Sequence, residues 1–149
     1  MYRVFVDTNI LLDLVTADRE NHEVCKGLVK RCIRQDVSLH ALASSYKDVY
    51  YVFMRHHGSE ADARDAVRKL RRAFETVELT DGIVATAIDS DEPDFEDGII
   101  RAAAESAGAY AIVSRDATAF ANSPVPKMHP AEFKLPEPAN AGLPSTASE

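Results

Sequence analysis

The stretch that decides the fold is VFVDTN, residues 4–9 of a 149-residue chain. Residues 4–6 are apolar, β-branched or aromatic, which is typical of a short strand buried on both faces. Three polar residues then follow without a gap. Ligands of an open parallel sheet bind beyond the carboxyl ends of its strands. We therefore expect Asp7 to lie at a ligand-binding edge of such a sheet.

The composition is that of an ordinary globular domain, with 46% hydrophobic and 28% charged residues. The length suffices for one domain with a sizeable core. No apolar run approaches the ~20 residues of a membrane helix, and the first residues do not resemble a signal peptide. Cys25 and Cys32 lie seven apart in a predicted helix, roughly 10 Å along its axis and beyond disulfide reach. We expect a cytoplasmic protein without a structural zinc site.

Strands and helices alternate along the chain. The predicted strands are 2–6, 37–42, 76–79, 110–113 and 125–128. The predicted helices are 9–16, 20–34, 44–55, 60–75, 81–88 and 93–108, the last with Pro93 in its first turn. This order predicts an α/β fold with a mainly parallel sheet, covered on both faces. Residues 1–133 should form one domain, and the proline-containing segment 134–149 a disordered tail.

A second acid follows a second apolar strand. Asp116 comes three residues after the predicted strand 110–113, in AIVSRD. Parallel strands would bring Asp7 and Asp116 to the same edge of the sheet, although 109 residues separate them. Either acid alone could simply cap the helix that follows, because Asp is a preferred N-cap. Two acids at two strand ends favour a functional site.

The segment EPDFEDGII, residues 92–100, opens a helix with more acids. Asp94 and Asp97 are three apart and should share one helical face. Acids in a first turn also suit the helix dipole, which explains either acid but does not require both on one face. We expect Glu96 to point away from this pair. The opposite, buried face is predicted to hold Phe95, Ile99, Ala102 and Ala103.

Two further acids lie on predicted helices. Asp48, in SSYKDVYYVF, lies beside Val52 at the margin of an apolar stripe. The pattern leaves open whether its side chain is a solvated flank or a ligand in a cleft. Asp13, on the first helix, is predicted to be solvated and to play no part in a site.

Several carboxylates held close together repel one another and become protonated, unless a cation neutralises them. Oxygen ligands without Cys or His suit Mg²⁺ or Mn²⁺. Such ions can activate water and stabilise the leaving oxygen of a phosphodiester. The net charge of −7 argues against a large nucleic-acid-binding surface. The chain nevertheless has one candidate basic surface, on the predicted helix 60–75. It is either a solvated outer face or a binding surface for RNA or protein, and it comprises Arg64, Arg68, Arg71 and Arg72.

Four segments, in their order along the chain, resemble the PIN domain, and in particular VapC-type toxins and related bacterial PIN proteins. These segments are DTNILLD, SSYKDVYYVF, PDFEDGIIRAAA and YAIVSRD. The resemblance covers about residues 2–133. It implies a three-layer α/β/α sandwich and a metal-dependent endoribonuclease that acts on single-stranded RNA. The family's metal-binding acids fall on Asp7, Asp97 and Asp116, with Asp94 as a companion. The supporting polar residues are Thr8, Asn9 and Ser114.

The chain departs from the family pattern on the middle helix, where the family usually has Glu and this sequence has Asp48. Asp is one methylene shorter, so this catalytic acid would reach the metal only through water. The resemblance also implies a homodimer and a small antitoxin partner. We therefore expect a Mg²⁺- or Mn²⁺-dependent ribonuclease, the toxin of a type II toxin–antitoxin pair. The alternative is a non-catalytic PIN-like module that binds RNA or protein. A phosphatase would need a second Asp where the chain has Asn9.

Overall fold

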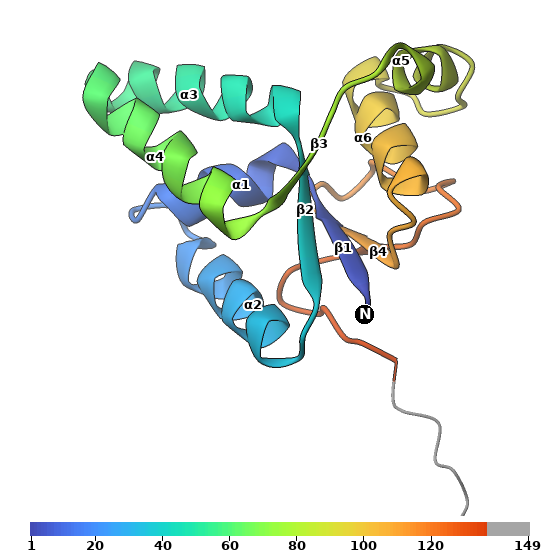
Figure 1. Cartoon of the computed structure of the whole chain (residues 1–149), viewed down its shortest axis with the longest axis horizontal. Helices are drawn as coiled ribbons and strands as arrows, with labels where there is room; N and C mark the ends of the chain where they lie inside the picture. The colour runs from blue at the N-terminus through green and yellow to red at the C-terminus, as the bar shows by residue number, and fades with distance from the viewer. Residues whose placement is uncertain (137–149) are drawn as a thin grey trace, which may run out of the picture.

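The computed structural model describes residues 1–136, in which pairs of helices separate the first four strands (Figure 1). The strands are β1 (Arg3–Val6), β2 (Ser38–Leu42), β3 (Glu75–Val77), β4 (Ala111–Val113) and β5 (Lys127–Met128). The helices are α1 (Thr8–Val15), α2 (His22–Arg34), α3 (Ala43–His57), α4 (Glu60–Ala73), α5 (Asp81–Ile88) and α6 (Phe95–Ser106).

The five strands form one parallel sheet in the order β3-β2-β1-β4-β5. The predicted α/β fold with a parallel sheet is confirmed. β1 is central, with Phe5 opposite His40 of β2 on one side and Ile112 of β4 on the other. The strand order changes direction between β1 and β4. Such a switch point is where open α/β sheets bind ligands, and Asp7 and Asp116 both follow strands that meet there.

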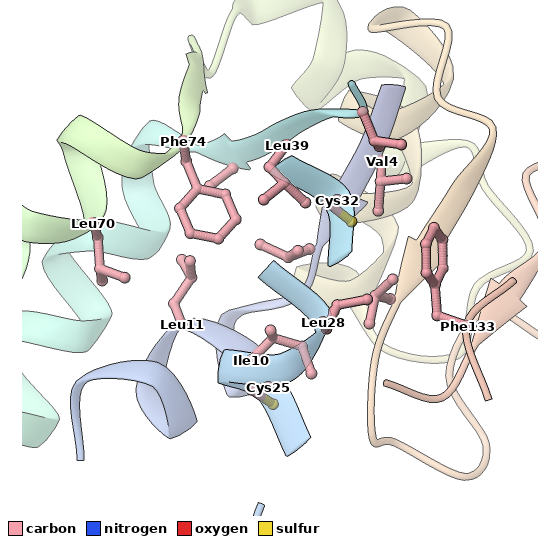
Figure 2. Packing of buried hydrophobic residues seen from close by; sticks show 14 of the residues in the cluster. Val4, Ile10, Leu11, Cys25, Leu28, Cys32, Leu39, Leu70, Phe74 and Phe133 are labelled. Carbon is pink, nitrogen blue, oxygen red and sulfur yellow. The ribbon is translucent and has the colours of Figure 1, made fainter. Parts of the chain in front are cut away.

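The sheet separates two hydrophobic layers, because successive strand residues point to opposite faces. Val4 packs with α1, α2 and α4 on one face (Figure 2). Val6 belongs to the same buried cluster. Phe5 and Ile112 pack with α5, α6 and the segment after β4 on the other face. Both faces are therefore covered, which explains why the central strands carry no polar alternation. The expected three-layer α/β/α sandwich is therefore confirmed.

The helix ends match the sequence expectations only in part. The third helix was predicted to begin at residue 44, but α3 begins at Ala43 without a side-chain cap. Gly58 has a φ of +66° and ends α3 in the left-handed conformation that favours glycine. Pro93 was predicted to lie in the first turn of α6, but it precedes the helix. Instead the Asp94 side chain accepts the Asp97 N–H at 3.0 Å, and α6 begins at Phe95. Phe95 is 52% exposed, so its predicted burial is wrong. As the first residue of the helix, it lies at the tip of α6, beyond the core.

The last described residues still contact the domain. Phe133 is buried, and the Tyr110 hydroxyl donates to the Lys134 carbonyl at 3.4 Å. Residues 137–149 lie outside the described residues, so the disordered tail stays a prediction.

Cys25 and Cys32 are buried, free thiols. Between residues 1 and 136, no helix is both long and apolar enough to cross a membrane.

Candidate carboxylate site at the sheet edge

Asp7 ends β1 as a buried acid, only 8% exposed. Its Oδ1 accepts the Thr8 N–H at 2.7 Å and so caps α1. Its Oδ2 accepts the Ser114 hydroxyl at 2.7 Å and the Asn9 amide at 3.3 Å. Asp7 is therefore both a helix cap and the centre of a polar group that joins β1 to the end of β4. Three neutral donors hold it, and no cation among the described residues pairs with it.

Thr8 and Ser114 link this group to its surroundings. The Thr8 hydroxyl does not bind Asp7; it donates to the Ser45 hydroxyl at 2.9 Å and joins α1 to α3. Ser114 is buried, and its oxygen accepts the Asp116 N–H at 3.1 Å. Ser114 therefore fixes the relative positions of Asp7 and Asp116 through one hydroxyl group.

Asp116 is exposed and stabilises the turn that follows it. Its Oδ1 accepts the N–H groups of Thr118 at 2.9 Å and Ala119 at 3.0 Å, together with the Thr118 hydroxyl at 3.2 Å. The backbone donors hold the pKa of Asp116 below its usual value, because they stabilise the ionised carboxylate. Asp116 is therefore a negative charge at the sheet edge under neutral conditions.

Asp97 is the acid whose environment differs most from water. It is half-buried in the first turn of α6, and its pKa is raised to about 7. Burial is the largest cause, followed by the negative charges of Asp7, Asp94, Asp116 and Glu92. Burial also raises the pKa of Asp7, although its hydrogen bonds oppose that shift. Acids from β1, α6 and the segment after β4 therefore influence one another's pKa values.

Asp48 is half-buried on α3, and its acidic neighbour is Glu96. The pKa of Glu96 is raised by burial and then by the nearby carboxylates of Asp48, Asp94 and Asp7. Glu96 was predicted to point away from the Asp94–Asp97 pair; instead it lies beside Asp48 of α3, and the charge of Asp94 also raises its pKa. That prediction used Phe95 to define the buried face of the helix, and Phe95 is itself exposed. The first turn of α6 instead brings Glu96 toward α3.

Glu92 is a further acid that sequence reasoning did not single out. Its side chain is 2% exposed and lies 3.5 Å from the Arg101 guanidinium. Its Oε1 accepts the N–H of Phe120 at 2.8 Å, a residue with a φ of 65°. Glu92 thereby holds the segment after β4 against the start of α6. No local pattern could reveal this contact, because 28 residues separate the two partners.

Asp13 is 1% exposed, so its predicted solvation is wrong. Its carboxylate accepts the Arg19 Nε–H at 2.8 Å and is bound by Arg115 Nε and by Arg115 Nη2, the latter at 3.2 Å. Arg115 lies between Ser114 and Asp116 in the sequence. Asp13 therefore anchors the strand end that carries two of the site residues. Arg19 is only six residues from Asp13, but Arg115 is 102 residues away, so the sequence could not show that two arginines meet at this acid.

The donors at the sheet edge suit a hard cation, but they do not form a finished cage. Within residues 1–136, no three carboxylate, His or Cys side chains are grouped closely enough to hold a metal ion as they stand. Carboxylate and amide oxygens are nevertheless the ligands that Mg²⁺ and Mn²⁺ prefer. Burial raises the pKa of Asp97 most, and the negative charges of four neighbouring acids raise it further; a bound cation would offset that second contribution. The donor set fits such an ion chemically.

Two hollows lie near these elements. One of about 490 Å³ lies beside Asp116 and is bordered by Arg115, Lys127 and His129. Its Lys127 ammonium donates to the Asp116 carbonyl at 2.6 Å. A groove of about 420 Å³ lies between α1, α2, α3 and α4, and none of the candidate acids lines it. Only the first hollow adjoins the carboxylates, and it places cations beside them.

A model of the PIN domain matches residues 3–118. The chain belongs to the PIN-domain family. The matched range contains all four candidate catalytic positions, Asp7, Asp48, Asp97 and Asp116. No curated protein matches this PIN-domain chain by sequence.

Solved structures with a similar fold include toxins and toxin complexes. Mycobacterium tuberculosis VapC20, described as a sarcin-ricin loop cleaving toxin, has a TM-score of 0.63 and 19% identity, over 80% of this chain and 94% of that chain. A Klebsiella pneumoniae toxin–antitoxin complex gives 0.60 and 20%, over 87% and 99%. FitAcB from Neisseria gonorrhoeae gives 0.62 and 17%, over 85% and 97%. At these identities the likeness supports the PIN fold.

Proposed function

We propose that this PIN protein is a Mg²⁺- or Mn²⁺-dependent endoribonuclease, the toxin of a type II toxin–antitoxin pair. The observation that carries the proposal is the mutual influence of Asp7, Asp97 and Asp116 at the switch point of the sheet. These three acids, with Asp94, would hold the ion. The ion would supply an activated water and charge stabilisation at the phosphodiester.

The chain's own residues have distinct parts in this proposal. Ser114 and Asn9 orient Asp7 through its Oδ2. Asp48, beside Glu96, would act on the water network and not as a direct ligand, because its side chain is short. Arg115 and Lys127 border the hollow next to Asp116, where a neighbouring phosphate of the RNA would lie.

The partners belong to the same proposal. The Klebsiella structure is described as a toxin–antitoxin complex, and another solved structure as FitAB bound to a DNA fragment. We extend the antitoxin partner to this chain, together with a homodimer and a cytoplasmic location. Analytical ultracentrifugation of the purified chain tests the homodimer directly.

A second candidate is a PIN module that binds RNA or protein without cutting. Two observations favour it: Asp48 stands where the family usually has Glu, and residues 1–136 contain no preassembled group of ligands. The two functions differ in what happens to bound RNA, so one assay separates them.

That assay measures cleavage of single-stranded RNA with Mn²⁺ by the wild type, Asp97→Asn and the control Asp89→Asn. Asp89 is an exposed acid at the C-terminal end of α5. We expect Asp97→Asn to lose at least about 100-fold in rate and Asp89→Asn to resemble the wild type. Equal rates for all three proteins would contradict the nuclease. RNA binding by a wild type that does not cut would support the second candidate.

A further inference from the structure

A second groove, on the outside of the molecule, differs in charge from the protein as a whole. It lies between α3 and α4 and has a volume of about 470 Å³. We call it the α3–α4 groove, and its lining residues are Tyr46, Lys47, Tyr50, Arg64, Val67, Arg68 and Arg71. Four of the seven are cationic and none is acidic, in a chain with a net charge of −7.

The cations of the α3–α4 groove are only partly neutralised by neighbouring acids. Arg64 is paired with Glu60, and Arg68 with Asp65 at 3.2 Å, both at the exposed surface of α4. Such exposed pairs are weak and easily exchanged. In the part of the chain that the structure describes, Lys47 and Arg71 make no ion pair. The groove therefore presents positive charge to an incoming anion.

Aromatic rings accompany this charge. The ring of Tyr50 packs edge-on against Tyr51, with centroids 5.2 Å apart. Tyr51 is 59% exposed, so its ring is accessible to a ligand. Proteins that hold single-stranded nucleic acid combine a cationic groove for the backbone with aromatic side chains on which bases stack. An acidic protein would use the charge but would gain little from the flat face of Tyr51.

The groove also leads toward the carboxylate site. Tyr46 and Tyr50 line the groove, while Asp48 on the same helix has Glu96 of α6 as its neighbour. At 100° per residue, Lys47 and Tyr51 project from α3 between these two directions and are four residues apart. A strand lying in the groove would therefore pass Lys47 and Tyr51 before it reaches Asp48.

We propose that the α3–α4 groove binds the single-stranded RNA adjacent to the cleaved bond, with Lys47 and Arg71 on its phosphates and Tyr51 stacked on a base. The inference rests on the proposed function, because it assigns the path of the same substrate. It would also explain how a chain with a net charge of −7 could hold RNA: the favourable contact is local and outweighs the repulsion from the overall negative charge.

The test measures fluorescence anisotropy with a labelled single-stranded RNA, in the Asp97→Asn protein so that the probe stays intact. Lys47→Glu combined with Arg71→Glu should weaken binding at least about tenfold at low salt. It should also reduce the slope of log affinity against log salt by about 1.4, the value for two lost phosphate contacts on a single strand. Tyr51→Ala should weaken binding about tenfold with the slope unchanged.

The matched control is Arg72→Glu, which makes the same charge change one residue away. Arg72 is exposed in the last turn of α4, like Arg71, but does not line the groove. A change below about twofold for Arg72→Glu, with the large loss for the double variant, supports the groove. Equal losses for Arg71→Glu and Arg72→Glu would mean a general charge effect and would overturn it. Displacement of the RNA by polyglutamate at equal charge concentration would overturn the assignment to RNA.

Cleavage by proteins with intact acids separates this inference from the proposed function. If the wild type cuts RNA and the Lys47→Glu, Arg71→Glu protein has the same KM, RNA does not bind in the α3–α4 groove, although the proposed ribonuclease activity is supported. A raised KM for the double variant supports the groove. Groove-dependent RNA binding by a wild type that cuts nothing supports the groove and contradicts the nuclease.

Discussion

Asp7 and Asp13 are buried acids six residues apart, and the fold treats their charges in opposite ways. Asp13 is 1% exposed and is bound by the guanidinium groups of Arg19 and Arg115. Asp7 is 8% exposed and receives only neutral hydrogen bonds. Its charged neighbours include the acids Asp97 and Asp116.

The difference separates an acid that the fold needs from an acid that the fold tolerates. A buried carboxylate between two arginines is compensated, so folding stability alone accounts for Asp13. Carboxylates that face one another remain ionised only at a cost in free energy, unless a cation joins them. Stability does not explain why Asp97 lies within the electric field of Asp7, whereas the divalent ion of the proposed function would.

The largest expected effect on stability is at Asp13, the acid that two arginines compensate. Asp13→Ala removes the shared partner of Arg19 and Arg115. Because both arginines are partly exposed, the loss should be about 2–3 kcal/mol in the free energy of unfolding, below that for a fully buried pair. Urea denaturation measures it. Asp18→Ala, an exposed acid nearby, should change stability by less than about 0.5 kcal/mol. Equal losses of stability in Asp13→Ala and Asp18→Ala would contradict the structural role of Asp13.

The next prediction concerns the neutral support of Asp7. Ser114→Ala removes the hydroxyl that donates to Asp7 and accepts from the Asp116 N–H. The protein should lose about 1 kcal/mol of stability, and its Mn²⁺ affinity should fall about 10- to 100-fold, as for other residues that orient a metal ligand. Calorimetric titration measures the affinity, with the exposed Ser106→Ala as control. Unchanged Mn²⁺ binding would show that Ser114 does not position the site.

The smallest effect is the pH dependence of the uncompensated acids. The pKa of Asp97 is raised to about 7 in the metal-free fold. Its stabilising contribution is therefore present at low pH and is lost as pH rises through 7. The melting temperature in EDTA should fall from pH 5 to pH 8, and less so in Asp97→Asn. The increase in melting temperature on adding Mn²⁺ should grow over the same range, because the metal displaces the proton. A constant Mn²⁺ effect from pH 5 to pH 8 would contradict this account.

The sequence predicted the parts of the site that depend on strand ends. Asp7 and Asp116 follow short apolar strands, and parallel pairing then places both at one edge. It could not predict Asp13, because the compensating Arg115 lies 102 residues later. It misplaced Glu96, because Phe95 looked like a core residue although it lies at an exposed helix tip. Long-range ion pairs and helix-tip orientation depend on tertiary contacts, which periodicity does not report.

The most direct test of the account is a calorimetric titration of the wild type, Asp97→Asn and Asp89→Asn with Mn²⁺ at pH 8. The account predicts micromolar binding by the wild type and Asp89→Asn, and loss of that binding in Asp97→Asn. Equal binding by all three proteins, or none by the wild type, would contradict the claim that the crowded carboxylates form a metal site.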